Sequence, residues 1–369
     1  MAKNDLFVQR RERLRRLLKK SKLPVAMIVT NVDNVTYLTG FTGDSSSLIL
    51  TSDEELLVSD SRFTIQISEE CPGLPTETRT SKFTADQFLA KIAAKKKIPS
   101  IVVESDNLTK SRFDSLQQNC KLSTLIDSQG LVQQLRAIKD KTEIAKIENA
   151  VRVAERAFDV VRARMTPDQT EAQVAHALEA EIRRFGGKAC SFDPIVGVGP
   201  RAALPHAVVT DRKIGENPFV LIDWGARVDG YVSDLTRVLI TGKISPKLQR
   251  IYEVTLKAQL SAISKIRPGA TIKDVDFAAR KVIDDAGFGK HFGHGLGHGI
   301  GLQVHELPFL SPISDGELKA GMVVTVEPGI YLPNWGGVRI EDDVLVTNDG
   351  HRVLSSVPKS LDATSVAIS

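Results

Sequence analysis

Cysteines are few in this chain of 369 residues, and long apolar runs are absent. The three cysteines, Cys71, Cys120 and Cys190, are odd in number and far apart. This pattern excludes a disulfide framework, so we expect three small buried apolar side chains in a reducing compartment, the cytoplasm. No apolar stretch is long enough for a signal sequence or a membrane span, so we expect no membrane partner. The net charge of +4 is too small to predict a nucleic-acid-binding face.

The basic residues are densest near the start of the chain, in the segment QRRERLRRLLKKSK. The segment predicts a solvated amphipathic helix with Leu14, Leu17 and Leu18 turned inward. A membrane-surface helix and a transit peptide are the alternatives, although Asp5 and Glu12 are unusual in a transit peptide.

The length of the chain exceeds what a single core usually supports, so the sequence predicts two domains. The first third alternates short apolar runs with helical patterns, which predicts an α/β domain over residues 1–132. The expected strands are 25–29, 47–51, 55–59 and 100–103, and the expected helices are 6–21, 62–69, 84–95 and 110–118.

The second predicted domain covers residues 133–369 and begins with helices up to about residue 186. Ile144, Ile147, Val151, Ala154 and Phe158 recur at steps of three and four, which places them on one helix face. After residue 190 strands return, joined by DG and NWGG turns, with two more helices expected at 246–264 and 272–286. This domain is therefore predicted to be α+β, with an antiparallel sheet.

Two aspartates flank a predicted hairpin in the stretch LIDWGARVDGYVSDLTR. If the turn is centred between Val228 and Asp229, then Asp223 and Asp234 lie opposite each other on one face of the sheet. Like charges in this arrangement need neutralisation, which metal ions provide. Two exposed surface aspartates are the alternative, but the apolar run before Asp223 favours burial.

Two glutamates repeat this pattern in TVEPGIY and GVRIEDD. Glu327 and Glu341 each follow an apolar strand, where an unpaired charge is costly. The intervening YLPNWGG predicts a bend between them. Glutamates at the rim of a loop are the alternative.

Histidines cluster in HFGHGLGHGIGLQVHE, which contains four of the seven in the chain. His294 and His298 have the spacing of a helical metal pair, but the interleaved glycines argue against a helix and favour close backbone approach. Clustered histidines are typical of metal sites. A phosphate-binding loop is the competing use of the glycines, but the spacing matches no dinucleotide or Walker motif.

Four carboxylates and one imidazole suit two adjacent divalent cations: Asp223, Asp234, His298, Glu327 and Glu341. Oxygen-rich ligation indicates Mn²⁺ first, with Co²⁺ or Zn²⁺ as alternatives. Two such ions can share a water and lower its pKa, and the hydroxide can attack an amide carbonyl. A neighbouring carboxylate can move the proton, and histidines can stabilise the oxyanion.

These stretches, in this order, resemble the pita-bread metallopeptidases, which include Xaa-Pro aminopeptidases, Xaa-Pro dipeptidases (prolidases) and methionine aminopeptidases. NVTYLTGFTG and SDSRFTIQ look like the N-terminal domain of the Xaa-Pro branch. The resemblance implies a creatinase-like α/β N-terminal domain and an α+β pita-bread domain whose curved antiparallel sheet carries the metal site.

The resemblance also implies a role for each residue. Asp223 would bind one metal ion, His298 and Glu327 the other, and Asp234 and Glu341 would bridge them. Glu327 would also be the general base. The remaining implied residues are His206 and His305 at the scissile peptide, His294 near the proline, and Arg339 as the residue that positions a bridging carboxylate.

The resemblance predicts an Xaa-Pro aminopeptidase that releases the first residue from peptides with proline second, and a homodimer. Phe309, in HELPFLS, stands where many dipeptidase-like members carry a basic residue, which favours longer peptides. A prolidase restricted to dipeptides is the near alternative. A metal-free creatinase-like hydrolase and a binding module on the same fold are more remote, because both usually lack some of the ligands.

Overall fold

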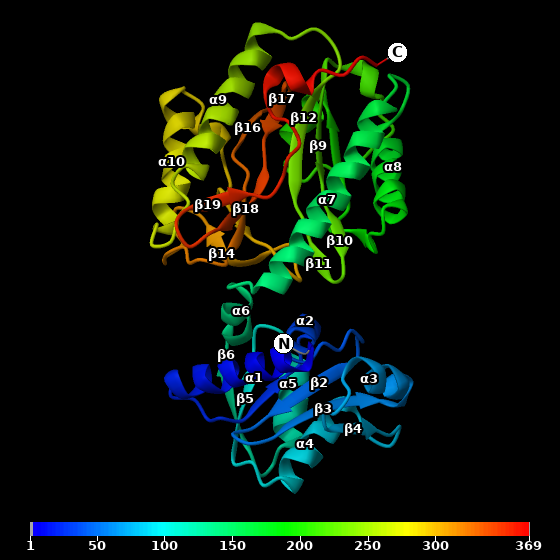
Figure 1. Ribbon diagram of the computed structural model, residues 1–369, viewed down its shortest axis with the longest axis vertical. Helices are drawn as coiled ribbons and strands as arrows, with labels where there is room; N and C mark the ends of the chain where they lie inside the picture. The colour runs from blue at the N-terminus through cyan, green and yellow to red at the C-terminus, as the bar shows by residue number, and fades with distance from the viewer. Residues whose placement is uncertain (1–2, 369) are drawn as a thin grey trace. The chain divides into compact units, whose positions relative to one another are not determined.

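The chain folds as two units, Met1–Arg136 and Ala137–Ser369, in a computed structural model that describes residues 3–368. The sequence placed this division after residue 132. Figure 1 shows the first unit in blue to cyan and the second in green to red. No described helix is long and apolar enough to cross a membrane.

A mixed six-stranded sheet forms the centre of the first unit, in the order β4-β3-β2-β1-β5-β6. β1 and β2 pair antiparallel, whereas β1 and β5 pair parallel. All four predicted strands are present, with ends that differ by one or two residues from the prediction. The strands are β1 Met27–Val29, β2 Ser46–Leu50, β3 Glu55–Asp60, β4 Thr76–Arg79, β5 Ser100–Glu104 and β6 Thr124–Ser128.

Helices cover this sheet and include all four that the sequence predicts. The predicted helix at 62–69 is a short 3₁₀ turn, Ser61–Phe63, followed by α3. Strands β4 and β6 and the short helix α2 were not predicted, because each is brief: β4 is entirely polar, and β6 and α2 mix polar with apolar residues. The helices are α1 Lys3–Lys20, α2 Val32–Thr39, α3 Thr64–Glu70, α4 Ala85–Lys95, α5 Lys110–Asn119 and α6 Leu131–Arg136.

The basic helix α1 is less solvated than its composition predicts. Leu14 and Leu18 are fully buried, as expected, and Leu17 is half-buried. Arg11 and Arg15 are also buried, and both pair with Glu55. Much of the positive charge is therefore used inside the protein, because guanidinium groups can bury their stems when a carboxylate receives the head.

The second unit begins with the expected helices. Ile147, Val151, Ala154 and Phe158 are buried along one face of α7, and Ile144 is half-buried. Capping boxes begin α7 and α8 at Asp140 and Thr170. Figure 1 shows the pair α7 and α8 on one side of the strands and the pair α9 and α10 on the other. These helices are α7 Lys141–Ala163, α8 Glu171–Arg184, α9 Pro246–Ile263 and α10 Ile272–Asp285.

Antiparallel ladders make up the strands of this unit. The main groups are β12-β9-β8 and β14-β13-β15-β18-β19, with smaller groups β11-β10-β7 and β16-β17. The strands are β7 Ala189–Cys190, β8 Ile195–Val198, β9 Phe219–Trp224, β10 Ala226–Val228, β11 Tyr231–Val232, β12 Leu235–Ile240, β13 Gly297–Gly299, β14 Glu306–Leu310, β15 Val323–Val326, β16 Gly329–Leu332, β17 Gly336–Arg339, β18 Asp342–Val346 and β19 His351–Val353.

Alternation along β9 assigns its two faces. Val220, Ile222 and Trp224 pack in the core that includes α7 and α8, and Trp224 stacks on Phe158 with ring centroids 4.1 Å apart. Phe219 and Leu221 pack in the core that includes α9 and α10. Since side chains alternate along a strand, Asp223 projects from the second of these faces.

The cysteines are all free thiols, as the sequence predicts. Cys71 and Cys120 are buried, but Cys190 is only partly so, which corrects the expectation of three buried side chains. Cys190 lies in the short edge strand β7, where only one neighbouring strand covers it. Burial nevertheless raises the pKa of the Cys190 thiol to about 12, so the reactive thiolate is disfavoured.

Candidate active site

Asp223 lies one residue before the end of the antiparallel ladder between β9 and β12, but it does not pair with Asp234. Its partner across the ladder is Thr236, because the hairpin turn is centred between Asp229 and Gly230 rather than one residue earlier. Both turn residues have positive φ, +48° and +84°, as a tight two-residue hairpin requires. The predicted face-to-face pairing is therefore wrong. Asp234 precedes Thr236 by two residues, so the two aspartates are diagonal neighbours on one face.

Asp343 holds the backbone at Asp234. The Asp234 amide donates a hydrogen bond to Asp343 Oδ2 over 3.0 Å. Asp343 lies on β18, in register with Thr325 of β15. This contact ties the start of β12 to the second group of strands, so that carboxylates from both groups can meet.

Glu327 and Glu341 lie between two ladders that share one register. Val326 pairs with Asp342 on one side of them, and Gly329 pairs with Arg339 on the other. The two glutamates therefore fall opposite each other, where the chain leaves one ladder and enters the next. The prediction that an apolar strand precedes Glu327 is confirmed, whereas the strand before Glu341, β17, has the sequence GGVR and ends two residues earlier.

His298 sits in the middle of the short strand β13, and no helix forms there. A side chain at Gly297 would approach the Thr325 carbonyl oxygen to 2.2 Å, so this glycine permits the close approach of β13 and β15. His298 Nδ1 lies 3.1 Å from the Gly299 carbonyl oxygen. Because a carbonyl can only accept, Nδ1 carries a proton, and Nε2 is the ring nitrogen that could bind a cation.

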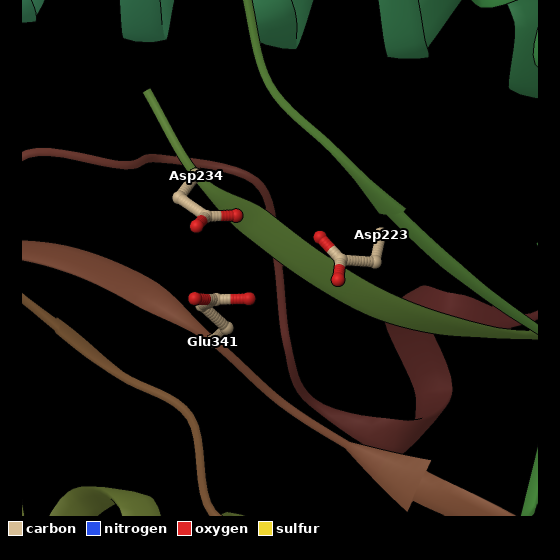
Figure 2. A group of neighbouring side chains, drawn as sticks. All are labelled: Asp223, Asp234 and Glu341. Atoms are coloured by element: carbon tan, nitrogen blue, oxygen red, sulfur yellow. The ribbon is translucent and has the colours of Figure 1, made fainter. Parts of the chain in front are cut away.

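The five predicted ligands converge. One oxygen from each of Asp223, Asp234 and Glu341 lies within 4.8 Å of the others, and Figure 2 shows the three carboxylates turned toward a common centre. His298 Nε2 lies 3.3 Å from Glu327 Oε1 and 3.8 Å from Asp234 Oδ2. Residues more than 100 positions apart thus form one buried cluster.

Negative charge in this cluster exceeds what the protein neutralises. Burial, followed by the charge of neighbouring carboxylates, raises the pKa of Asp234 and of Glu341 well above the usual range. Burial also raises the pKa of Asp223, against the opposing effect of Arg339. At Glu327, the hydrogen bond and charge of His298 outweigh burial, and the pKa is lowered. Cations between these groups would relieve the repulsion.

Two unpartnered carboxylate oxygens also indicate that the cluster can bind divalent cations. Asp223 Oδ1 and Asp234 Oδ1 are both buried, and neither has a hydrogen-bond partner among the described residues. Such carboxylate oxygens are rare in protein interiors unless they bind an ion. Hard oxygen ligands with one imidazole suit Mn²⁺, Co²⁺ or Zn²⁺.

Arg339 connects the cluster to the histidines. Its guanidinium donates to Asp223 Oδ2 at 2.6 Å, to Thr236 Oγ1 at 3.0 Å and to the Tyr331 hydroxyl at 3.0 Å. Thr236 in turn donates to Glu341 Oε2. The direct partner of Arg339 is therefore Asp223, and Arg339 reaches Glu341 only through Thr236.

His294 is held in one tautomer at the end of this network. Its Nδ1 lies 2.7 Å from the Gly295 carbonyl oxygen and its Nε2 lies 2.9 Å from the Tyr331 hydroxyl. Nδ1 therefore carries the proton and Nε2 accepts from the tyrosine. Burial lowers the pKa of His294 and raises the pKa of Tyr331 to about 12, so both groups are neutral at physiological pH.

A single cavity of about 960 Å³ contains all of the predicted site residues in its lining. His206 and His305 line it as exposed side chains, and the His305 ring centroid lies 4.3 Å from that of His298. Desolvation, together with the neighbouring His298, lowers the pKa of His305. The lining includes His206, Asp223, Asp234, His294, His298, His305, Glu327, Arg339 and Glu341.

Thr236, Tyr331 and Asp343 also belong to this site, although the sequence did not single them out. Thr236 could have been found by strand alternation, since it lies two residues after Asp234. Tyr331 and Asp343 lie inside the distinctive stretches, but only the hydrogen-bond geometry gives them partners.

Comparison with known families agrees with this geometry. The model of metallopeptidase family M24 matches residues 145–348, and the creatinase/prolidase N-terminal domain matches residues 10–138. The chain belongs to family M24. It is 37% identical over 356 residues to an uncharacterized peptidase, YqhT, of Bacillus subtilis, which covers 95% of this chain and 98% of that protein.

Solved structures of M24 peptidases superimpose closely on the chain. An Xaa-Pro dipeptidase from Bacillus anthracis has a TM-score of 0.92 at 36% identity, covering 96% of this chain and 99% of that one. An X-Pro aminopeptidase from Thermotoga maritima has a TM-score of 0.87 at 33% identity, covering 97% and 100%. The predicted fold, a creatinase-like domain followed by a pita-bread domain, is confirmed.

Proposed function

We propose that this M24 peptidase is an Xaa-Pro aminopeptidase that requires two divalent cations, with Mn²⁺ as the first candidate. The observation that carries the proposal is the convergence of five ligand side chains and three histidines on one cavity. Ligands alone would support metal storage as well. The histidines beside them support peptide-bond hydrolysis.

Asp223, Asp234, His298, Glu327 and Glu341 would hold the two cations, with Asp234 and Glu341 shared between them. Bound cations in such a site supply Lewis acidity toward the scissile carbonyl and lower the pKa of water. Glu327 would also act as the general base, because its lowered pKa keeps the carboxylate ionised and able to accept a proton.

The histidines bind the peptide around the scissile bond. Since the pKa of His305 is lowered, its ring is neutral and can donate one N–H to the oxygen that gains charge during attack. His206 lines the same cavity and offers a second donor. His294, neutral and fixed by Tyr331, presents an apolar ring face that suits a pyrrolidine.

Apolar side chains in the cavity wall, among them Ile195, Pro205 and Ala207, suit a proline in the second position. A prolyl amide has no N–H to offer a peptidase, and its ring fixes φ. An enzyme for this bond must therefore recognise the shape of the ring rather than a backbone donor.

The preference for longer peptides rests on the lack of a free cation in the cavity wall. Within the lining, Arg339 is the only arginine, and no lysine is present. Its guanidinium is occupied by Asp223, Thr236 and Tyr331. Phe309 occupies the position in register with His298 on the neighbouring strand, and it is about half exposed. A dipeptide carboxylate would meet this ring, whereas a longer peptide would pass it as a neutral amide.

The test uses purified protein with Mn²⁺ and three peptides that share the same first residue: Ala-Pro, Ala-Pro-Ala and Ala-Ala-Ala. The expected result is release of alanine fastest from Ala-Pro-Ala, more slowly from Ala-Pro, and not at all from Ala-Ala-Ala. Cleavage of Ala-Pro in preference to Ala-Pro-Ala would identify a prolidase instead, in line with the similarity to Xaa-Pro dipeptidases.

Asp234→Asn is the control that distinguishes an enzyme from a non-catalytic binding module on the same fold. The amide keeps the size of the side chain but removes a charge that two cations would share, so activity is lost while the fold is retained. If the wild type binds metal and cleaves none of the three peptides, the proposed function is wrong.

A further inference from the structure

The loop that carries His305 lacks regular secondary structure. Residues 301–305 connect β13 to β14 as a series of bends. No described residue forms a hydrogen bond with the His305 ring, whose nearest aromatic neighbour is His298. The position of the His305 ring is therefore set by the backbone of its loop.

The Glu306 side chain fixes the backbone of this loop through hydrogen bonds. Its Oε1 accepts hydrogen bonds from the amides of Leu302 at 2.8 Å and Gln303 at 3.1 Å. The carboxylate is buried, and it lies so close to Gly301 that a Cβ there would come within 2.6 Å of Oε2. This side chain thus joins two amides of the loop, just ahead of His305, while Arg227 holds the Leu302 carbonyl.

Lys139 neutralises this carboxylate. Its Nζ lies 3.1 Å from Glu306 Oε2, and the two side chains are only 1% and 4% exposed. The Lys139 backbone is itself fixed, because its amide donates to the Gly321 carbonyl at 2.8 Å. With little solvent to compete, the ion pair holds the carboxylate in one orientation.

We infer that Glu306 and Lys139 are positioning residues for His305. Neither lines the catalytic cavity. Their effect is to keep the loop at 301–305 in the one arrangement that holds the imidazole beside His298. The inference rests on the proposed function for the role of His305 in hydrolysis, but the loop geometry is independent of that role.

A double-mutant cycle separates positioning from general stability. Glu306→Ala removes the acceptor for both amides, and a displacement of about 1 Å at a catalytic group costs roughly 100-fold in rate. We expect kcat/KM for Ala-Pro-Ala to fall by that order in Glu306→Ala. In a His305→Ala background the same substitution lowers it little further, because the group it positions is already absent.

Two further variants guard against misfolding. Glu306→Gln keeps an acceptor oxygen, and the double variant Lys139→Met/Glu306→Gln removes both charges without leaving either one buried alone. We expect Glu306→Gln to recover much of the lost activity. Glu171→Gln is the matched control: Glu171 is also buried, pairs with Arg201 and accepts from the Val198 amide. Its effect should add to that of His305→Ala.

Hydrogen exchange and NMR give a readout that needs no activity. In folded Glu306→Ala the amides of Leu302 and Gln303 should exchange on the order of tenfold faster, and the ¹⁵N signals of the His305 ring should broaden or shift.

Full additivity with His305→Ala, or unchanged exchange and ring signals, would overturn the inference. A wild type that cleaves no Xaa-Pro peptide would overturn the proposed function instead, and the exchange and ring measurements would still decide the positioning.

Discussion

Removal of Arg339 should lower the stability of the metal-free protein, and bound metal ions should restore part of the lost stability. Arg339 is buried and is the one cation in hydrogen-bond contact with Asp223 among the described residues. The change is Arg339→Met, which keeps the length of the side chain and removes its charge and its donors.

The magnitude follows from the local geometry. Unit charges 4 Å apart interact by about 4 kcal/mol at an effective dielectric constant of about 20. Loss of one partner from a buried pair typically costs about 3–5 kcal/mol, because the other charge remains unpaired. We therefore expect the free energy of unfolding to fall by roughly 4 kcal/mol at neutral pH. At acidic pH the loss is smaller, since Asp223 can take up a proton.

The assay is urea unfolding of the metal-free protein, repeated with saturating Mn²⁺. A cation beside Asp223 replaces the missing charge, so Mn²⁺ should stabilise Arg339→Met more than it stabilises the wild type. The matched control is Arg237→Met. Arg237 is equally buried, but it pairs with Asp342, which is not among the proposed ligands. Mn²⁺ should give that variant no extra stabilisation.

Equal stabilisation of the two variants by Mn²⁺ would refute the reasoning, because the charge on Asp223 would then not be shared between Arg339 and a metal ion. An Arg339→Met protein as stable as the wild type would refute the magnitude.

Three further predictions concern pH, substrate length and the core. Because the pKa values of Asp234 and Glu341 are raised, the folded metal-free protein binds more protons than the unfolded chain. Its melting temperature should therefore fall as the pH rises above about 4 toward the raised pKa values. Mn²⁺ should release these protons on binding and abolish the fall. Phe309→Arg should increase kcat/KM for Ala-Pro relative to Ala-Pro-Ala by about tenfold, measured by alanine release, because it adds a cation for the dipeptide carboxylate; an unchanged ratio would remove Phe309 from the argument. Trp224→Ala should lower the free energy of unfolding in urea by about 3–5 kcal/mol, since the buried indole stacks on Phe158. The Mn²⁺ affinity of the folded variant, measured by calorimetry, should stay within a few-fold of the wild-type value. A large loss of affinity would show that this core shapes the site.

Apolar pattern and motif spacing were enough to predict much of the fold. The regular periods in the α7 segment and in the strands before Asp223 and Glu327 reflect burial, which sequence records directly. The elements that were missed are short: β4 is entirely polar, and β6 and α2 mix polar with apolar residues. Their structure depends on the neighbours that the sheet and its helices provide.

Register was the point at which sequence reasoning went wrong. A hairpin turn placed one residue too early set Asp234 opposite Asp223, whereas the structure pairs Asp223 with Thr236. Sequence patterns allow several turns in VDGY, and the choice among them depends on which turn fits the twist and the packing of both strands.

Sequence patterns were enough to identify the kinds of chemistry available to this protein: three carboxylates after apolar runs, a fourth in YVSDLTR, and a histidine cluster among glycines that disfavour a helix. Tertiary structure alone decided how these groups meet. It made Arg339 the partner of Asp223, fixed the tautomer of His294, and brought the Glu306 carboxylate into hydrogen-bond contact with the loop that carries His305. Those contacts join residues far apart in the chain, and a carboxylate or imidazole acquires its pKa and its partner only from what folding brings within a few ångströms of it.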